Sequence, residues 1–122
     1  MLIRGRVKEG CKDSPRRMTR HPQVFAEATG AALNPGTINL RVALPIPIKE
    51  DFRIKGEAIG EPEQDLIFER CRIAGRDAFR IQPCNLETGR GGHGDDTLEI
   101  TCSEKITGVT PGAEFEVGFF RD

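Results

Sequence analysis

Thr37 and Asn39 are the two side chains of this 122-residue sequence whose types and spacing best suit metal chemistry. They belong to the cleanest alternation of apolar and polar residues in the chain, Thr37–Leu44, which predicts a strand after the Asn34-Pro35-Gly36 turn. Because successive side chains of a strand point to opposite faces, Thr37 and Asn39 would share one face. Their oxygen atoms could hold Mg²⁺, which completes its octahedron with water and phosphate. From the residues alone, the alternative is the polar outer face of an amphipathic strand.

The stretch from Cys84 to Asp96 is a second candidate, because it gathers four glycines around one histidine. Such a composition predicts a loop rather than a regular element. Glycine amides in a loop can cradle an anionic or planar ligand, and His93, Asp95 or Asp96 could accept a proton there. The alternative is a surface loop that binds nothing.

Glu99 lies in the strand predicted over Thr97–Cys102, where the apolar residues Leu98 and Ile100 share one face. Its carboxylate must point to the opposite face, since side chains alternate along a strand. The alternation alone therefore indicates an outward position for Glu99 and nothing more specific.

The segment from Arg4 to Arg20 is distinctly basic, with seven Lys or Arg residues against two acidic ones. A phosphate-bearing ligand would be attracted to it, whereas the alternative is a solvated basic face. The chain as a whole carries a formal net charge of −1, which gives no general attraction to nucleic acid. We therefore expect small phosphate-bearing partners and no nucleic acid.

Short strands are the elements that must position these residues. Apolar alternation predicts them over Leu2–Val7, Thr37–Leu44, Asp65–Ile73, Ala78–Gln82, Thr97–Cys102 and Glu114–Phe120, with a short additional one over Phe52–Ile54. We expect Pro83 to end the strand that precedes it, and Cys11–Arg20, which Pro15 interrupts, to be a loop. The one helix is predicted over Pro22–Thr29, with proline in its first turn and glycine after its end.

Six or seven short strands with one short helix favour a mainly β fold, because helices and strands do not alternate along the chain. A closed or nearly closed β-barrel would remove the exposed edges of an open sheet. The length suits a single domain over residues 1–122.

Several classes of protein are disfavoured by what the sequence lacks. No stretch approaches the roughly 20 apolar residues of a membrane span, and no apolar leader follows Met1, so we expect a cytoplasmic protein without a membrane partner. The four cysteines are widely separated, which predicts free thiols rather than a zinc site. The phosphate-loop and dinucleotide-binding motifs of the familiar kinases and dehydrogenases do not occur.

The order of features resembles the archaeal-type CTP-dependent riboflavin kinases. A basic first strand closes on Gly10, a short helix follows, and Asn34-Pro35-Gly36-Thr37-Ile38-Asn39-Leu40 matches the family signature P-x-G-T-[LI]-N-[LV]. A hairpin, a His-containing loop, the strand at Thr97–Ile100 and a Pro-Gly turn before Glu114 then follow in the family's order, so the resemblance spans nearly the whole chain. It implies the cradle-loop barrel of that family.

The resemblance also implies an activity and a set of roles. The family transfers the γ-phosphate of CTP to the 5′-hydroxyl of riboflavin and gives FMN. Its signature Thr and Asn coordinate Mg²⁺, which corresponds to Thr37 and Asn39, and its flavin contacts correspond to His93 and Glu99. By position, the nucleotide would contact the first loop and a late segment, at Gly10, Lys12, Ser14, Arg16, Glu104, Lys105, Ile106 and Thr107.

The sequence departs from the family in three places. The family's first loop is glycine-rich with an aromatic residue, whereas Cys11–Arg17 is not, and Lys12, Arg16 and Arg17 could replace its backbone contacts by charge. Only His93 remains of a Thr-aromatic-His run, and Cys102-Ser103 replaces an Ala-Pro pair. Besides the enzyme, two alternatives therefore stay open: a nucleotide- or flavin-binding module without turnover on the same barrel, and a DNA-binding regulator of a related fold.

Overall fold

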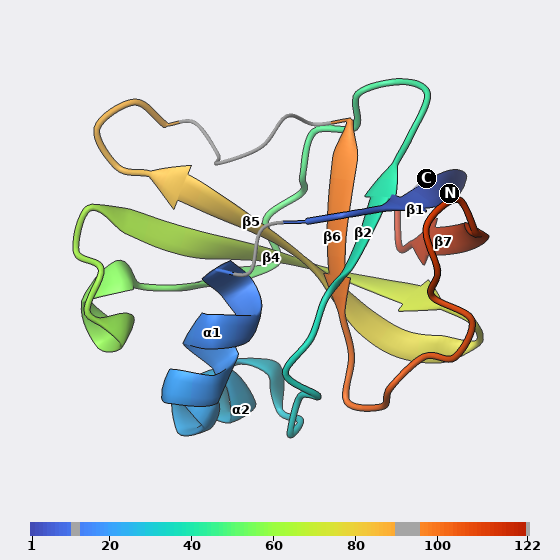
Figure 1. Cartoon of the computed structure of the whole chain (residues 1–122). Helices are drawn as coiled ribbons and strands as arrows, with labels where there is room; N and C mark the ends of the chain where they lie inside the picture. Colours follow the sequence, from blue (N-terminus) through green and yellow to red (C-terminus); the bar gives the residue numbers. More distant parts are fainter. Residues whose placement is uncertain (11–12, 90–95, 122) are drawn as a thin grey trace.

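The computed structural model describes residues 1–10, 13–89 and 96–121, and over these ranges the chain is mainly β, as predicted (Figure 1). The elements, in chain order, are β1 (Leu2–Lys8), α1 (Asp13–Arg20), α2 (Pro22–Thr29), β2 (Ile38–Arg41), β3 (Phe52–Ile54), the 3₁₀ helix η1 (Gly56–Ile59), β4 (Gln64–Ile73), β5 (Arg76–Asn85), β6 (Thr97–Thr101) and β7 (Glu114–Phe119). No helix within the described ranges has both the length and the apolar character that a membrane crossing requires.

All the strand pairings are antiparallel and belong to one sheet in the order β3-β4-β5-β6-β2-β1-β7. The sheet also joins its own end, because β4 pairs with β7 through Cys71–Ile73. The pairings from β4 through β5, β6, β2, β1 and β7 therefore return to β4 and form a ring, with β3 outside it.

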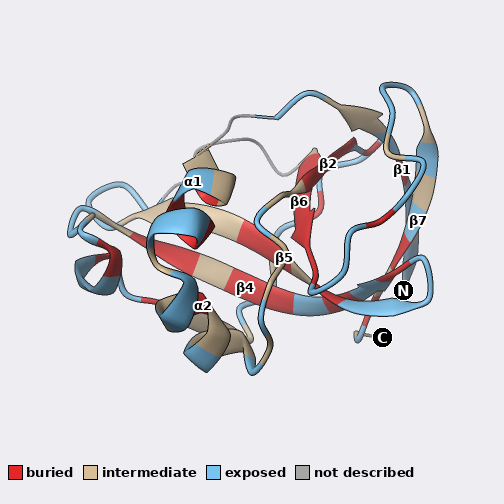
Figure 2. Ribbon diagram, turned by 60° about the horizontal axis from the view of Figure 1, so that its bottom comes forward, coloured by how far each residue is buried: buried red, intermediate tan, exposed pale blue. Residues whose placement is uncertain are grey.

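Side chains on the two faces of the sheet form two apolar clusters. One cluster gathers residues of β2, β4, β5, β6 and β7, including Ile38, Leu40 and Leu98. The other lies under the helices, where Met18 of α1 and Phe25 of α2 pack with Phe68 of β4 and its neighbours. Figure 2 shows both helices on the same side of β4 and β5. This second face is the one that carries the candidate site.

The prediction of a loop over Cys11–Arg20 is wrong for its described part, because Asp13–Arg20 forms the helix α1. The described residues therefore include two short α-helices rather than the one predicted. Pro15 is the third residue of α1 and lies in the first turn, where the backbone N–H groups have no partner within the helix. Asp13 in the first turn and Arg17 and Arg20 in the last turn interact favourably with the helix dipole. The sequence conceals this helix because its buried face includes Ser14 and Arg17 instead of an apolar stripe.

The bounds of two other predicted elements are confirmed, and those of a third differ from the prediction. The ranges of α2 and β3 are as predicted, and Gly30 ends α2 in the left-handed conformation with φ 75°. The observed strand β2, Ile38–Arg41, is shorter than the strand predicted over Thr37–Leu44. It ends at Arg41, opposite the first residue of β6.

Pro83 does not end a strand, contrary to the prediction, and β5 continues through it to Asn85. Pro83 pairs with Leu66 of β4, while the pairing of β5 with β6 covers only Phe79–Ile81. Because β6 does not pair with Pro83, that neighbouring strand does not require the N–H that proline lacks. The predicted Cys84–Asp96 loop consequently loses its first two residues to β5, and residues 90–95 lie outside the described ranges.

Candidate functional site

Asn39 and Glu99 lie directly opposite each other in the pairing of β2 with β6. Directly opposed residues of paired strands share a face, so both side chains project toward the helices. Asn39 is 8% exposed and Glu99 is 3% exposed, because α1 covers this face. The polar face is therefore not a solvated outer surface, which had been the alternative to a metal site.

Hydrogen bonds connect these residues to α1 and to the start of β2. The hydroxyl groups of Ser14 and Thr37 donate to the Glu99 carboxylate. The Asn39 amide Nδ2 lies 3.3 Å from Thr37 Oγ1 and donates to it. Three segments far apart in the sequence thus contribute hydroxyl, amide and carboxylate oxygens to one cluster, which we call the Glu99 cluster: Ser14, Thr37, Asn39 and Glu99.

Burial raises the pKa of the Glu99 carboxyl, because the charged form loses its hydration. The hydrogen bonds from Ser14 and Thr37 and the positive charge of Arg17 lower it, but they do not overcome the cost of burial. Glu99 consequently holds a proton more readily than an exposed glutamate does. A carboxyl group in this condition is suited to accept and return protons.

Arg17 brings a buried positive charge to the same face of the sheet. Its Nε and Nη2 atoms donate to the two carboxylate oxygens of Glu61 at 2.7 and 2.9 Å. Its Nη1 atom is buried and has no hydrogen-bond partner among the described residues. The fork to Glu61 fixes the guanidinium, which acts on Glu99 through its charge.

Gly10 packs directly on the side chain of Asn39. A Cβ atom at Gly10 would lie 2.0 Å from Asn39 Nδ2 and 2.2 Å from Asn39 Cγ, which is well inside contact distance. The chain that leaves β1 thus crosses Asn39 closely before it reaches Ser14 in α1. Only glycine leaves room for the Asn39 amide in its present position.

Substitution of Gly10 by alanine should therefore displace the Asn39 side chain. Because the family resemblance implies that Asn39 holds Mg²⁺, the FMN formation that it also implies should fall about 10²-fold, the scale expected for a misplacement of about 1 Å. Gly118→Ala is the matched control, since its Cβ would meet Leu2 Cδ2 at an ordinary 3.4 Å. Initial rates of the two variants check the prediction, and equal rates would contradict it.

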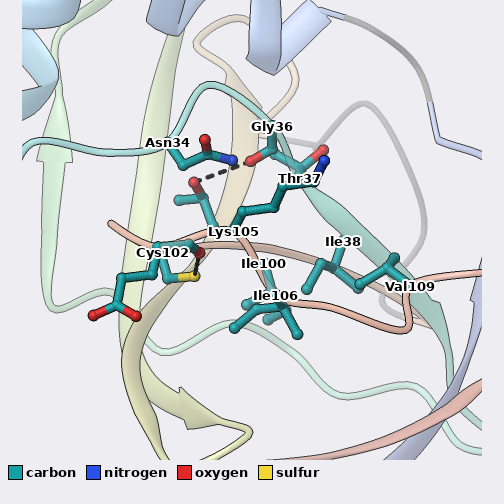
Figure 3. Close-up of a pocket in the computed structure, with 11 residues that line it drawn as sticks. Asn34, Gly36, Thr37, Ile38, Ile100, Cys102, Lys105, Ile106 and Val109 are labelled. Carbon is teal, nitrogen blue, oxygen red and sulfur yellow. Dashed lines mark hydrogen bonds between the residues drawn. The ribbon is translucent and has the colours of Figure 1, made fainter.

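A pocket of about 190 Å³ opens beside Thr37, between the start of β2 and the segment after β6 (Figure 3). Its lining includes Asn34, Thr37, Glu104, Lys105 and Ile106. The structure thus brings together the signature threonine and three of the four residues predicted to contact the nucleotide in the late segment. The fourth, which is Thr107, does not line the pocket.

Two contacts hold the walls of this pocket. Thr101 Oγ1 donates to the Gly36 carbonyl at 3.2 Å, which ties β6 to the turn before β2. The Cys102 thiol donates to the Glu104 carbonyl at 2.8 Å, and the Glu104 carboxylate pairs with Arg76 of the β4–β5 hairpin. The pocket therefore has a defined shape, with an apolar floor that includes Ile38, Ile100 and Ile106.

Two of the remaining predicted site residues, Arg16 and Asp96, do not join this arrangement. Arg16 is exposed and pairs with Asp13 of its own helix at 2.8 Å. Asp96, the predicted proton acceptor that is described, faces Arg41 at 3.8 Å. Lys12, His93 and Asp95 lie outside the described residues.

Two contacts of the site were not predicted from the sequence: the pairing of Arg17 with Glu61 and the contact of Ser14 with Glu99. The spacing of Ser14, Arg17 and Met18 over one helical turn could have revealed a buried helix face. No sequence signal joined Glu61 to Arg17, because the two residues are 44 positions apart.

No protein-family model matches the chain, and no curated protein matches it. The chemistry of the Glu99 cluster and of the adjoining pocket therefore carries the functional assignment.

Proposed function

We propose that the protein is a phosphotransferase of the CTP-dependent riboflavin kinase type, and that its ring of strands is a cradle-loop barrel. The reaction would transfer the γ-phosphate of CTP to the 5′-hydroxyl of riboflavin and give FMN and CDP. One observation carries the proposal: the Glu99 cluster combines hydroxyl and amide oxygens with a buried carboxyl, next to a pocket lined by Glu104, Lys105 and Ile106.

The donor set of the Glu99 cluster fits Mg²⁺, because hydroxyl, amide and carboxylate oxygens are the ligands that this ion prefers. Thr37 and Asn39 would hold the ion, as the family resemblance implies. When bound, Mg²⁺ neutralises charge on the phosphates during transfer. Among the described residues no three His, Cys, Asp or Glu side chains gather around a common point, so the ion would take its other ligands from water and phosphate.

Glu99 would act as the proton acceptor for the 5′-hydroxyl. The bond between the γ-phosphorus and its bridging oxygen breaks, the hydroxyl oxygen bonds to phosphorus, and the hydroxyl proton passes to the carboxylate. The raised pKa of Glu99 supports this role, since a base is more effective as its pKa approaches the working pH.

The pocket beside Thr37 would receive part of the nucleotide. At about 190 Å³ it is smaller than the roughly 300–1,000 Å³ of pockets that enclose a drug-sized ligand. It therefore suits a pyrimidine base or a ribose, with the phosphates directed toward Thr37.

A specific observation favours a second candidate, a flavin- or nucleotide-binding module without turnover. The resemblance implies a glycine-rich phosphate loop after the first strand, but Asp13–Arg20 is helical. Ser14 and Arg17 are already engaged with Glu99 and Glu61. These groups would have to change partners to contact phosphate.

Chromatography of riboflavin incubated with the purified protein, Mg²⁺ and either CTP or ATP separates the two candidates. The kinase proposal predicts FMN with CTP, little with ATP, and none when EDTA removes the metal. The absence of FMN with both donors, together with measurable riboflavin or CTP binding, would overturn the kinase proposal and support the binding module.

A further inference from the structure

Lys8 places a further positive charge on the face that carries the Glu99 cluster. It lies directly opposite Asn39 in the pairing of β1 with β2, and Asn39 lies opposite Glu99 in the pairing of β2 with β6. The three side chains therefore form one row across three strands. The Lys8 ammonium reaches across β2 and donates to Thr97 Oγ1 of β6 at 3.4 Å.

Lys8 has no ion-pair partner among the described residues, although it is partly buried. The neighbouring arginines differ in this respect, because each faces a carboxylate. The pairs are Arg6 with Glu114, Arg16 with Asp13, Arg17 with Glu61 and Arg41 with Asp96. Lys8 does not neutralise Glu99 either, since no ion pair joins them and the leading cationic influence on Glu99 comes from Arg17. No carboxylate among the described residues therefore neutralises the Lys8 ammonium, which leaves it suited to an anionic ligand.

The position of the Lys8 ammonium relative to the pocket indicates which group of a ligand it would contact. The pocket beside Thr37 lies at the end of β6 formed by Ile100 and Thr101, whereas Lys8 contacts Thr97 at the beginning of that strand. Glu99 lies between these two ends. A phosphoryl group that moves from a nucleotide in the pocket toward a hydroxyl at Glu99 would thus approach Lys8 as it leaves the nucleotide.

We infer that Lys8 binds the transferred phosphoryl group on the acceptor side of the site, and so recognises the phosphate monoester product. This inference rests on the proposed function, because it takes the donor to occupy the pocket beside Thr37. A compact ammonium is suited to this task, since it can donate to several phosphate oxygens without a fixed planar geometry. Lys8 would then distinguish the product from the uncharged acceptor.

Equilibrium binding of FMN and of riboflavin, followed by quenching of flavin fluorescence, tests this inference without turnover. Lys8→Met keeps most of the aliphatic stem and removes the charge, and Lys8→Arg keeps the charge. We expect Lys8→Met to weaken FMN binding about tenfold or more while riboflavin binding stays unchanged, and Lys8→Arg to recover part of the loss. Lys49→Met is the matched control, because Lys49 is an exposed lysine whose ammonium pairs with Asp51.

The outcomes separate this inference from the proposed kinase activity. Unchanged FMN affinity in Lys8→Met would overturn the role of Lys8, even if the wild type makes FMN. A wild type that makes no FMN but binds it in a Lys8-dependent manner would overturn the kinase proposal and support the role of Lys8. Equal losses of FMN and riboflavin affinity would also overturn the inference, because they would indicate a structural effect.

Discussion

Glu99→Gln should greatly slow FMN formation and at the same time stabilise the free protein. The substitution keeps the shape of the side chain and removes the group that would accept the hydroxyl proton. General acid–base groups typically contribute about 10²–10⁴-fold, so we expect the initial rate to fall by roughly 10³-fold. Affinity for riboflavin and CTP should change little, because glutamine keeps an oxygen that accepts hydrogen bonds from Ser14 and Thr37.

The gain in stability follows from the raised pKa of Glu99. A carboxyl whose pKa is higher in the folded state binds protons more tightly there than in the unfolded chain. At neutral pH the folded protein therefore carries the cost of a buried charge, and this cost disappears as the pH falls through the folded pKa. Glutamine removes the cost, and we expect a gain of about 1 kcal/mol in the free energy of unfolding at neutral pH, vanishing at acid pH.

Denaturant unfolding at several pH values, combined with initial rates, checks this prediction. Glu116→Gln is the matched control, because Glu116 is an exposed glutamate of β7. It should leave both the rate and the unfolding free energy nearly unchanged. A Glu99→Gln variant that makes FMN at the wild-type rate would exclude Glu99 as the proton acceptor.

Gly56→Ala should cause the largest loss of stability among single substitutions at the described glycines. A Cβ atom at Gly56 would lie 1.9 Å from the backbone carbonyl oxygens of both Gln64 and Glu61. Backbone atoms cannot rotate away as a flexible side chain can, so the segment itself must shift. We expect a loss of about 3 kcal/mol or more in the free energy of unfolding.

The shift would disturb two hydrogen bonds of Gly56, and the one to Glu61 leads to the candidate site. The Gly56 N–H donates to the Asp65 carboxylate at 2.9 Å, and this bond is the leading reason that the pKa of Asp65 lies below its usual value. Glu61, whose backbone N–H donates to the Gly56 carbonyl at 2.8 Å, carries the carboxylate that fixes Arg17. Displacement of this segment should therefore also loosen Arg17 beside Glu99.

Thermal and denaturant unfolding measure this effect. A loss of this size in a domain of about this length lowers the midpoint temperature by on the order of 10 °C. Gly118→Ala is again the control, because its added methyl group would make only an ordinary contact with Leu2. Equal unfolding midpoints in the two variants would contradict the packing described around Gly56.

The strands were largely predictable because their apolar alternation reports which face is buried. Ile38, Leu40 and Leu98 are buried as the alternation predicts. The helix α2 was predictable because Pro22 and Gly30 mark its ends. The missed helix α1 shows the limit of such patterns, since Ser14 and Arg17 are buried by polar contacts that depend on residues elsewhere in the chain.

The sequence predicted the direction of single side chains of the candidate site, but not which strands bring them together. The alternation of β6 indicates that Glu99 points away from the apolar face, but it does not indicate which strand lies beside it. The register that sets Glu99 opposite Asn39 joins residues 60 positions apart. The row of Lys8, Asn39 and Glu99 likewise depends on two pairings at once, which no local pattern encodes.

The most direct test of the proposed function is the initial rate of FMN formation from riboflavin, CTP and Mg²⁺ by the wild type and by a Thr37→Ala/Asn39→Ala double variant. Thr110→Ala, at an exposed turn, serves as the control, and circular dichroism checks that each variant is folded. We expect the double variant to lose at least about 10²-fold in rate while the control keeps the wild-type rate. FMN formation by the folded double variant at the wild-type rate would contradict the proposed site.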